Sequence, residues 1–384
     1  MQRFTLMFVT TWSILLMNAG FAYGEFMLST GMRADLFTDA DISEINGTEA
    51  TIPIDLAYRD EYLNLSFGTA YGRSQVNWGN DSQAELMAFT DAYLSASYVF
   101  SNLATGMILG IDMNLPFGKE RLNAAEQMAE VGKNNDLLEI DDFGQGLNIG
   151  VNLGLTQELG FGALGTSVAY IFMGDYDPTE EIDNDTFDPG DKILLATQYK
   201  WLISSTTYSW MTAEIFANYV HTFEDTEIGQ PIFQEGGQFI AGGTMRTYYS
   251  GLQLTLLGQY SFRTKNKENV EGALQTEPAN SNGQAFFGSA DALLKFSPRF
   301  AMRVLADVRY YDESARKDEE SGRPFEGRRI RFAAGPGFEY SMNRSLSLNG
   351  LVKYFTLTEE ESVMSDRQTT YHGGNLSFGI TYRL

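Results

Sequence analysis

The feature that most constrains the fold is a strict alternation of apolar and polar side chains. At the C-terminal end, one face consists of Leu376, Phe378, Ile380, Tyr382 and Leu384. The opposite face consists of Ser377, Gly379, Thr381 and Arg383. Successive side chains of a β-strand point to opposite faces. Because the alternation and the alternate-face charges recur in segment after segment, the pattern favours a wall between lipid and water over a soluble sandwich.

Sixteen segments show this alternation. They lie near 26–37, 50–58, 62–72, 88–100, 105–115, 144–156, 161–173, 191–202, 208–222, 236–248, 251–263, 283–296, 299–311, 329–341, 345–357 and 374–384. Their connections alternate between short turns and long loops rich in Asp and Glu. We therefore predict an all-β fold, a transmembrane antiparallel up-and-down β-barrel of about sixteen strands. Fourteen to eighteen strands also fit. Pro336, in the middle of a segment, predicts a β-bulge, and Pro53 is a similar irregularity.

Residues 1–24 are predicted to be a cleaved signal peptide. Arg3 supplies a positive charge, 5–17 is an apolar core, and Ala22-Tyr23-Gly24 has the small residues that cleavage requires. A cut after Ala22 is the alternative. The barrel is then predicted to span 25–384, with long acidic extracellular loops and both ends on the periplasmic side. Because the first strand begins so near the cleavage site, we expect no plug, passenger or periplasmic domain.

The composition narrows the partners. The chain has no cysteine and a mean hydropathy of −0.22, and the only long apolar stretch is the predicted signal peptide. A formal charge of −23 disfavours nucleic acid as a partner. Aromatic residues fall at outward positions near both ends of the predicted strands, where membrane headgroups would lie. We expect contact with outer-membrane lipid and lipopolysaccharide.

These features resemble the porin-like outer-membrane β-barrels of Gram-negative bacteria. The likeness is one of pattern and spans 25–384. The C-terminal apolar positions are similar to the assembly signal of those barrels, although Leu384 stands where an aromatic residue is usual. The segment from Gly110 to Lys119 is similar to a segment of barrels assigned to the uptake of aromatic compounds. The resemblance implies an outer-membrane location and admits a homo-oligomer.

Charged residues occupy many of the predicted inward positions. We predict that the pore is lined by Asp35, Asp55, Asp91, Asp112, Lys200, Arg246, Arg303, Asp307, Arg309, Arg329, Arg331 and Lys353. The acidic members concentrate in the first third of the chain and the basic members follow. Two interpretations stay open at this point. Opposed arcs could create a transverse field across the pore, or the lumen charges could neutralise one another and make the wall hydrated and rigid.

One predicted loop is dense in carboxylates. It contains Asp175, Asp177, Asp183, Asp185 and Asp188. Hard oxygen ligands at this density suit Ca²⁺. The loop lacks the glycine and closing glutamate of an EF-hand, so a solvated extracellular loop is the preferred interpretation. Divalent ions that bridge the loop to lipopolysaccharide are a third alternative.

No motif predicts catalysis or a cofactor. The GxGxxG match at 160–165 straddles a turn and enters a strand, whereas a dinucleotide site needs a helix after the glycines. His221 and His372, the two histidines, have no spacing that suggests a catalytic dyad. We therefore expect no enzyme activity and no cofactor. The predicted function is a passive outer-membrane channel for small hydrophilic solutes. The alternative is a structural barrel that sheathes or anchors a partner, such as an electron carrier or a surface assembly.

Overall fold

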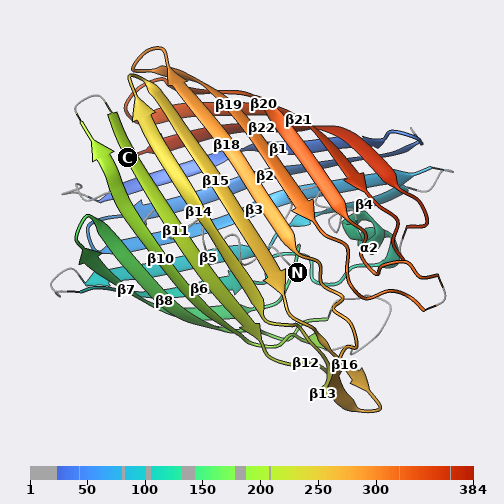
Figure 1. Cartoon of the computed structure of the whole chain (residues 1–384). Coiled ribbons are helices and arrows are strands. Elements are labelled where there is room, and N and C mark those ends of the chain that lie inside the picture. Colours follow the sequence, from blue (N-terminus) through green and yellow to red (C-terminus); the bar gives the residue numbers. More distant parts are fainter. Residues whose placement is uncertain are drawn as a thin grey trace.

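A computed structural model describes residues 24–42, 44–79, 83–100, 105–131, 143–177, 187–206, 209–319, 321–363 and 365–384. These residues form a closed antiparallel β-barrel of sixteen strands with no plug domain among them (Figure 1). Residues 1–23 of the predicted signal peptide lie outside the described residues. Among the described residues, no helix is long and apolar enough to cross a bilayer.

The wall runs in sequence order, and β22 pairs with β1 to close it. Its first half consists of β1 (Glu25–Asp39), β2 (Ile45–Arg59), β3 (Leu63–Trp78), β4 (Gln83–Phe89) with β5 (Ala92–Phe100), β6 (Gly106–Leu115), β7 (Asn148–Leu159), β8 (Gly162–Phe172) and β10 (Lys192–Ser205). Its second half consists of β11 (Ser209–Thr222), β14 (Gln238–Tyr249), β15 (Leu252–Arg263), β18 (Ala285–Lys295), β19 (Phe300–Tyr311), β20 (Arg329–Ser341), β21 (Leu346–Glu359) and β22 (Thr369–Arg383).

β4 and β5 form a single barrel strand with a bulge. β3 pairs with both, but the register changes by one residue between the Tyr71–Phe89 pair and the Gly68–Tyr93 pair. The extra residue falls at Thr90–Asp91. There the Thr90 hydroxyl accepts the backbone N–H of Ala70 at 3.0 Å, which replaces a lost ladder bond. The bulge turns Asp91 toward a loop that folds into the lumen.

The two strand prolines need no bulge, so that prediction is wrong for Pro336. The β20–β21 register is the same on either side of Pro336, and β19 pairs with it directly. Pro53 likewise interrupts the β1–β2 ladder without a shift of register. In each case the ladder to one neighbouring strand lacks pairs only next to the proline, and the ladder to the other neighbour is continuous.

Short turns join the strands at one end of the barrel, the turn end, and most long loops lie at the other, the loop end (Figure 1). The sequence pattern predicts a long loop at every connection of the loop end. This prediction is wrong for two connections, 40–44 and 79–82. They are short because β2, β3 and β4 extend beyond the predicted segments. At the loop end, β9 (Phe187–Asp188), β12 (Asp225–Glu227), β13 (Gln230–Gln234), β16 (Lys267–Val270) and β17 (Ala273–Thr276) form a small separate sheet.

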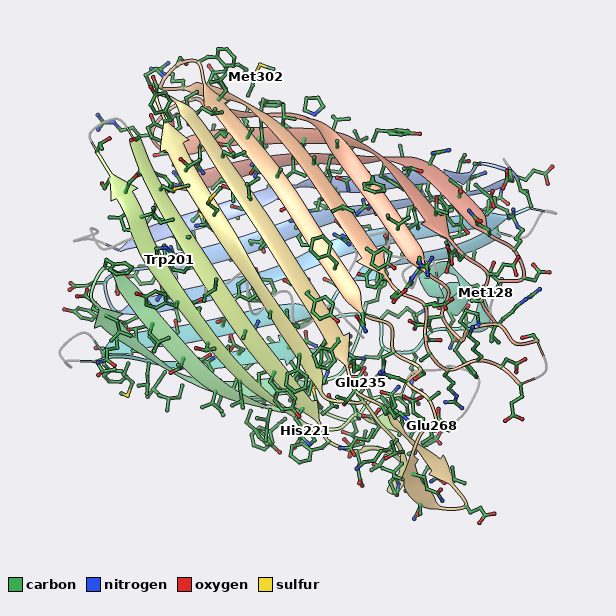
Figure 2. The ribbon with its side chains drawn as sticks, in the orientation of Figure 1. Met128, Trp201, His221, Glu235, Glu268 and Met302 are labelled. Carbon is green, nitrogen blue, oxygen red and sulfur yellow. The ribbon has the colours of Figure 1, made fainter. Side chains whose placement is uncertain are left out.

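The outer face of the wall is apolar. Val151 is 46% exposed and lies between Ile111 and Tyr170 of the neighbouring strands. Aromatic side chains cluster near both ends. Tyr199 stacks on Trp201 near the turn end, and His221 contacts Phe223 near the loop end (Figure 2). An apolar wall of this kind needs lipid around it, and a closed barrel leaves no unpaired strand edge within it. The chain is therefore an integral membrane β-barrel.

Candidate functional site in the barrel lumen

A buried charged network lies on the inner face of β19, β20 and β21, which we call the charged arc. Lys353 Nζ lies 3.0 Å from Asp307 Oδ2, and Arg331 Nη1 lies 3.9 Å from Asp307 Oδ1. All three side chains are buried. The arrangement follows from the sequence because these residues occupy alternate, inward positions on three consecutive strands. The central carboxylate offsets two cations that would otherwise be costly to bury.

Aromatic rings lie against two arginines at the loop end of this arc. The Arg331 guanidinium lies 4.9 Å from the centre of the Phe355 ring, and Arg329 lies 4.9 Å from that of Tyr311. Arg309 pairs across the strands with Arg331. The structure therefore brings together Arg309, Arg329 and Arg331, as expected for residues on two adjacent strands. Arg303 lies farther toward the turn end of β19, the strand that also carries Arg309.

Arg303 belongs to a second ion pair. Its Nε donates to Asp291 Oδ1 at 2.8 Å, its Nη2 donates to Oδ2, and Glu339 lies 4.0 Å away. The bidentate geometry fixes the guanidinium against the wall. Across β18–β21, acidic and basic side chains thus contact each other. For this arc, the contacts favour the interpretation in which the lumen charges neutralise one another.

The predicted acidic residues of the first strands bind neutral donors instead. Asp55 accepts a hydrogen bond from the Tyr93 hydroxyl at 2.7 Å, and Asp112 accepts one from Asn152 Nδ2 at 2.7 Å. Asp35 accepts one from Asn375 Nδ2. Each carboxylate is held at the inner wall by a partner on another strand. No cation is needed to fix them there.

Asp91 holds both ends of the β6–β7 loop inside the barrel. Its carboxylate accepts hydrogen bonds from Gly118 N at 2.9 Å, from Gln145 N at 2.8 Å and from Asn114 Nδ2 at 2.6 Å. The two ends of the loop run so close together that a side chain at Gly118 would collide with the Phe143 carbonyl. Three hydrogen bonds to one charged group make a strong clamp.

The helix of this loop packs on the inner wall. α2 (Ala124–Val131) begins with a capping box, in which the Asn123 side chain accepts the N–H of Glu126 and the Glu126 side chain accepts the N–H of Asn123. The Ser74 hydroxyl of β3 donates to the Ala129 carbonyl at 3.1 Å. Apolar contact with the inward face of β4 completes the packing; the buried cluster is Ala84, Leu86, Leu122, Ala129 and Phe143. The loop narrows the lumen near the loop end.

Sequence reasoning missed this loop because 116–147 reads as a polar connection. Two signals were present. The inward positions Ala84 and Ala88 are small and leave room for a helix, and Asn123 with Glu126 is a capping-box pattern.

The electrostatics of the loop also affect Glu120. Burial is the largest cause that raises the pKa of the Glu120 carboxyl, and the nearby Asp91 carboxylate raises it further.

The remaining predicted lumen residues lie on the opposite side of the barrel. Lys200 of β10 pairs across the strands with Glu214 of β11. Arg246 of β14 is a diagonal neighbour of Glu214, because Thr244 stands opposite that glutamate. Glu214 also lines a cavity of about 180 Å³ at the inner face of β5 to β8, β10 and β11, which we call the neutral cavity. Its residues were not predicted as a site, since uncharged inward positions carry no obvious sequence signal.

The carboxylate-rich loop gives no cation site among the described residues. No group of three or more potential metal ligands occurs in this part of the chain. Asp177 forms an ion pair with Arg121 at 2.7 Å, which ties this loop to the β6–β7 loop. Asp183 and Asp185 lie outside the described residues. Asp175 and Asp188 are described but belong to no such group. The calcium interpretation is untested for the loop as a whole.

No protein-family model matches the chain, and no curated protein matches it. Solved structures with a similar fold include Acinetobacter baumannii OccAB3, at 7% identity over 94% of this chain and 100% of that one, with a TM-score of 0.46. Pseudomonas aeruginosa OccK7 matches at 10% identity over 94% and 99%, with a TM-score of 0.45. The CymD monoaromatic hydrocarbon channel matches at 14% identity over 93% and 88%, with a TM-score of 0.41.

Similarity at these sequence identities and TM-scores does not indicate which solute the chain binds or transports. The fold is established by the strand pairing of the chain itself, which closes through β22 and β1. With an apolar outer face and a polar inner face, the chain has the fold of a sixteen-stranded transmembrane β-barrel, and it resembles the porin-like outer-membrane barrels at the level of fold.

Proposed function

We propose that the barrel is a passive channel for small hydrophilic solutes across a Gram-negative outer membrane. The observation that carries the proposal is the closed wall of sixteen strands with charged and amide side chains on its inner face. Barrels of this size enclose more space than their own inward side chains fill. Asp291, Asp55 and Asn152 are examples of inward polar groups, so water is the expected content of the lumen.

The β6–β7 loop is the proposed size filter. It lies against the inner wall of β3 and β4, and Asp91 clamps both of its ends. In this proposal the twelve predicted pore residues divide by role. Those in buried contacts, such as Asp307 and Lys353, stiffen the wall. Partly exposed ones, such as Arg303 and Lys200, face the passing solute.

Conductance of the purified full chain in planar bilayers tests this function. We expect steady open channels, and Asp91→Ala should raise the mean conductance or its fluctuations, because the loop loses its clamp. A matched control is Asp60→Ala, which removes an aspartate that accepts the N–H groups of Tyr62 and Leu63 in a turn at the other end of the barrel. Silent bilayers from correctly folded protein would contradict the channel and favour the structural barrel.

A further inference from the structure

The neutral cavity differs from the rest of the inner wall in what lines it. Apolar side chains on neighbouring strands form most of its surface, with Glu214 as the one carboxylate and no cation among its described lining residues. Its apolar lining includes Ile108, Ala169, Leu194, Phe216 and Val220. Four of these five are fully or almost fully buried. An apolar recess in a water-filled lumen is a place where an apolar surface gains free energy by leaving water.

Two amide groups in the cavity have atoms without partners. Asn152 is 9% exposed, and its Oδ1 has no hydrogen-bond partner among the described residues. Its orientation is set by the neighbouring carboxylate, because Asp112 can only accept and therefore binds the Nδ2 side. Asn218 Nδ2 also lacks a partner among the described residues. The cavity thus presents one free acceptor and one free donor.

An unpartnered buried amide atom is costly, so the cavity favours an occupant that supplies the missing bonds. The two amides stand on β7 and β11, with β8 and β10 between them, so one small polar group bonds to one of them. A hydroxyl group suits either amide, because it donates through its hydrogen and accepts through its oxygen. The volume limits the rest of the molecule. An apolar protein cavity of about 150 Å³ accommodates benzene, and the neutral cavity, at about 180 Å³, has room for a single ring with one small substituent.

We propose that the neutral cavity is a binding site for an uncharged, one-ring compound that carries a hydroxyl or amide group. The ring packs against Phe216 and Leu194, and the polar group accepts a hydrogen bond from Asn218 Nδ2, on the same strand as Phe216. An anionic ring compound is excluded by Glu214 and by the cost of desolvating its charge. The inference deepens the proposed function by naming a solute class, and it rests on that function for the passage of the solute.

Phenol binding to the purified, folded barrel in detergent, measured by isothermal titration calorimetry, tests the site. We expect saturable binding of phenol, with benzene and benzoate each bound at least about threefold more weakly. Asn218→Leu should weaken phenol binding about 3–10-fold through the loss of one neutral hydrogen bond. Ala169→Phe should abolish it by filling the cavity. The matched control is Asn349→Leu, an inward asparagine on β21, outside the cavity, which should leave binding unchanged.

The outcomes separate this inference from the proposed channel. Equal phenol binding by the wild type, Asn218→Leu and Ala169→Phe would show partition into detergent and would overturn the site. If Ala169→Phe does not fold, Asn218→Leu against Asn349→Leu decides. Silent bilayers with intact phenol binding would overturn the channel and leave the site standing. Steady channels without saturable phenol binding would overturn the site alone.

Discussion

The charged arc and the neutral cavity lie half a turn apart on the same inner wall. The strand order places β19–β22 opposite β7–β11, as Figure 1 shows. In the charged arc, Asp307, Arg331 and Lys353 are buried against one another. In the neutral cavity, Asn152 and Asn218 each keep a polar atom that has no hydrogen-bond partner among the described residues. In the charged arc, buried charges are held by ion pairs with one another, whereas the neutral cavity presents uncharged amide groups to a bound solute.

This comparison changes the expected electrostatics of the lumen. The two sides of the inner wall differ mainly in polarity, because one side is charged and the other is largely apolar. This difference adds to any separation of acidic from basic residues around the lumen. A solute with one polar and one apolar side can satisfy both walls at once. Such orientation needs no net field across the pore.

The largest expected effect comes from breaking the charged arc. Asp307→Leu leaves Lys353 and Arg331 buried without their shared carboxylate, so we expect a loss of about 3–5 kcal/mol in the free energy of unfolding. Urea unfolding of the barrel in lipid vesicles measures it. Adding Lys353→Met should restore part of the stability, because an apolar pair replaces a broken ion pair. Asn218→Leu in the neutral cavity is the contrast, with an expected change below about 1 kcal/mol. Equal losses at the two sites would remove the distinction between the walls.

A smaller effect separates the two faces of one strand in the neutral cavity wall. Val151→Arg puts a charge on the lipid face of β7, at its fourth residue, and should cost up to about 2–4 kcal/mol. Asn152→Arg, one residue on, faces the lumen beside Asp112 and should change folding little. The same variant should abolish phenol binding, because the arginine fills the cavity. Folding yield into vesicles measures the first comparison, and equal tolerance of both substitutions would show that the assigned faces are wrong.

Much of the wall was predictable because lipid on one side and water on the other imposes a period of two. The sixteen strands and the inward positions of Asp307 and Arg331 follow from that period. Strand ends beyond the membrane were missed, as in β2 and β3, because water on both sides removes the alternation. The contacts among the charges also escaped prediction. They depend on register, which turns and bulges set and which the alternation of a single strand does not contain.

The loop and the neutral cavity were missed for different reasons. The β6–β7 loop folds inward through Asp91, whose partners Gly118 and Gln145 are distant in sequence and bind through backbone N–H groups that no sequence pattern displays. The cavity arises from mostly uncharged residues on six strands, such as Ala169 and Asn218. No single lining residue gives a signal in the sequence of its own strand. The cavity forms only because the strands place these residues side by side.

Ion selectivity should show the smallest effect. The loops are acidic and favour cations at the mouth, whereas the basic residues of the charged arc favour anions within the pore. Exposed loop charges act over about 8–10 Å at physiological salt and fade as salt rises, so we expect weak selectivity at low salt that shifts toward anions at higher salt. Replacing Arg303, Arg309, Arg329 and Arg331 with glutamine should move the reversal potential in a KCl gradient toward cations. Because Arg331 is 1% exposed and Arg329 is also buried, the double variant of Arg303 and Arg309 should account for most of that shift. Arg328→Gln in the loop is the control, and its effect should vanish at high salt. A shift produced by Arg329 and Arg331 alone would mean that these buried arginines, and not the partly exposed Arg303 and Arg309, border the path of the ions.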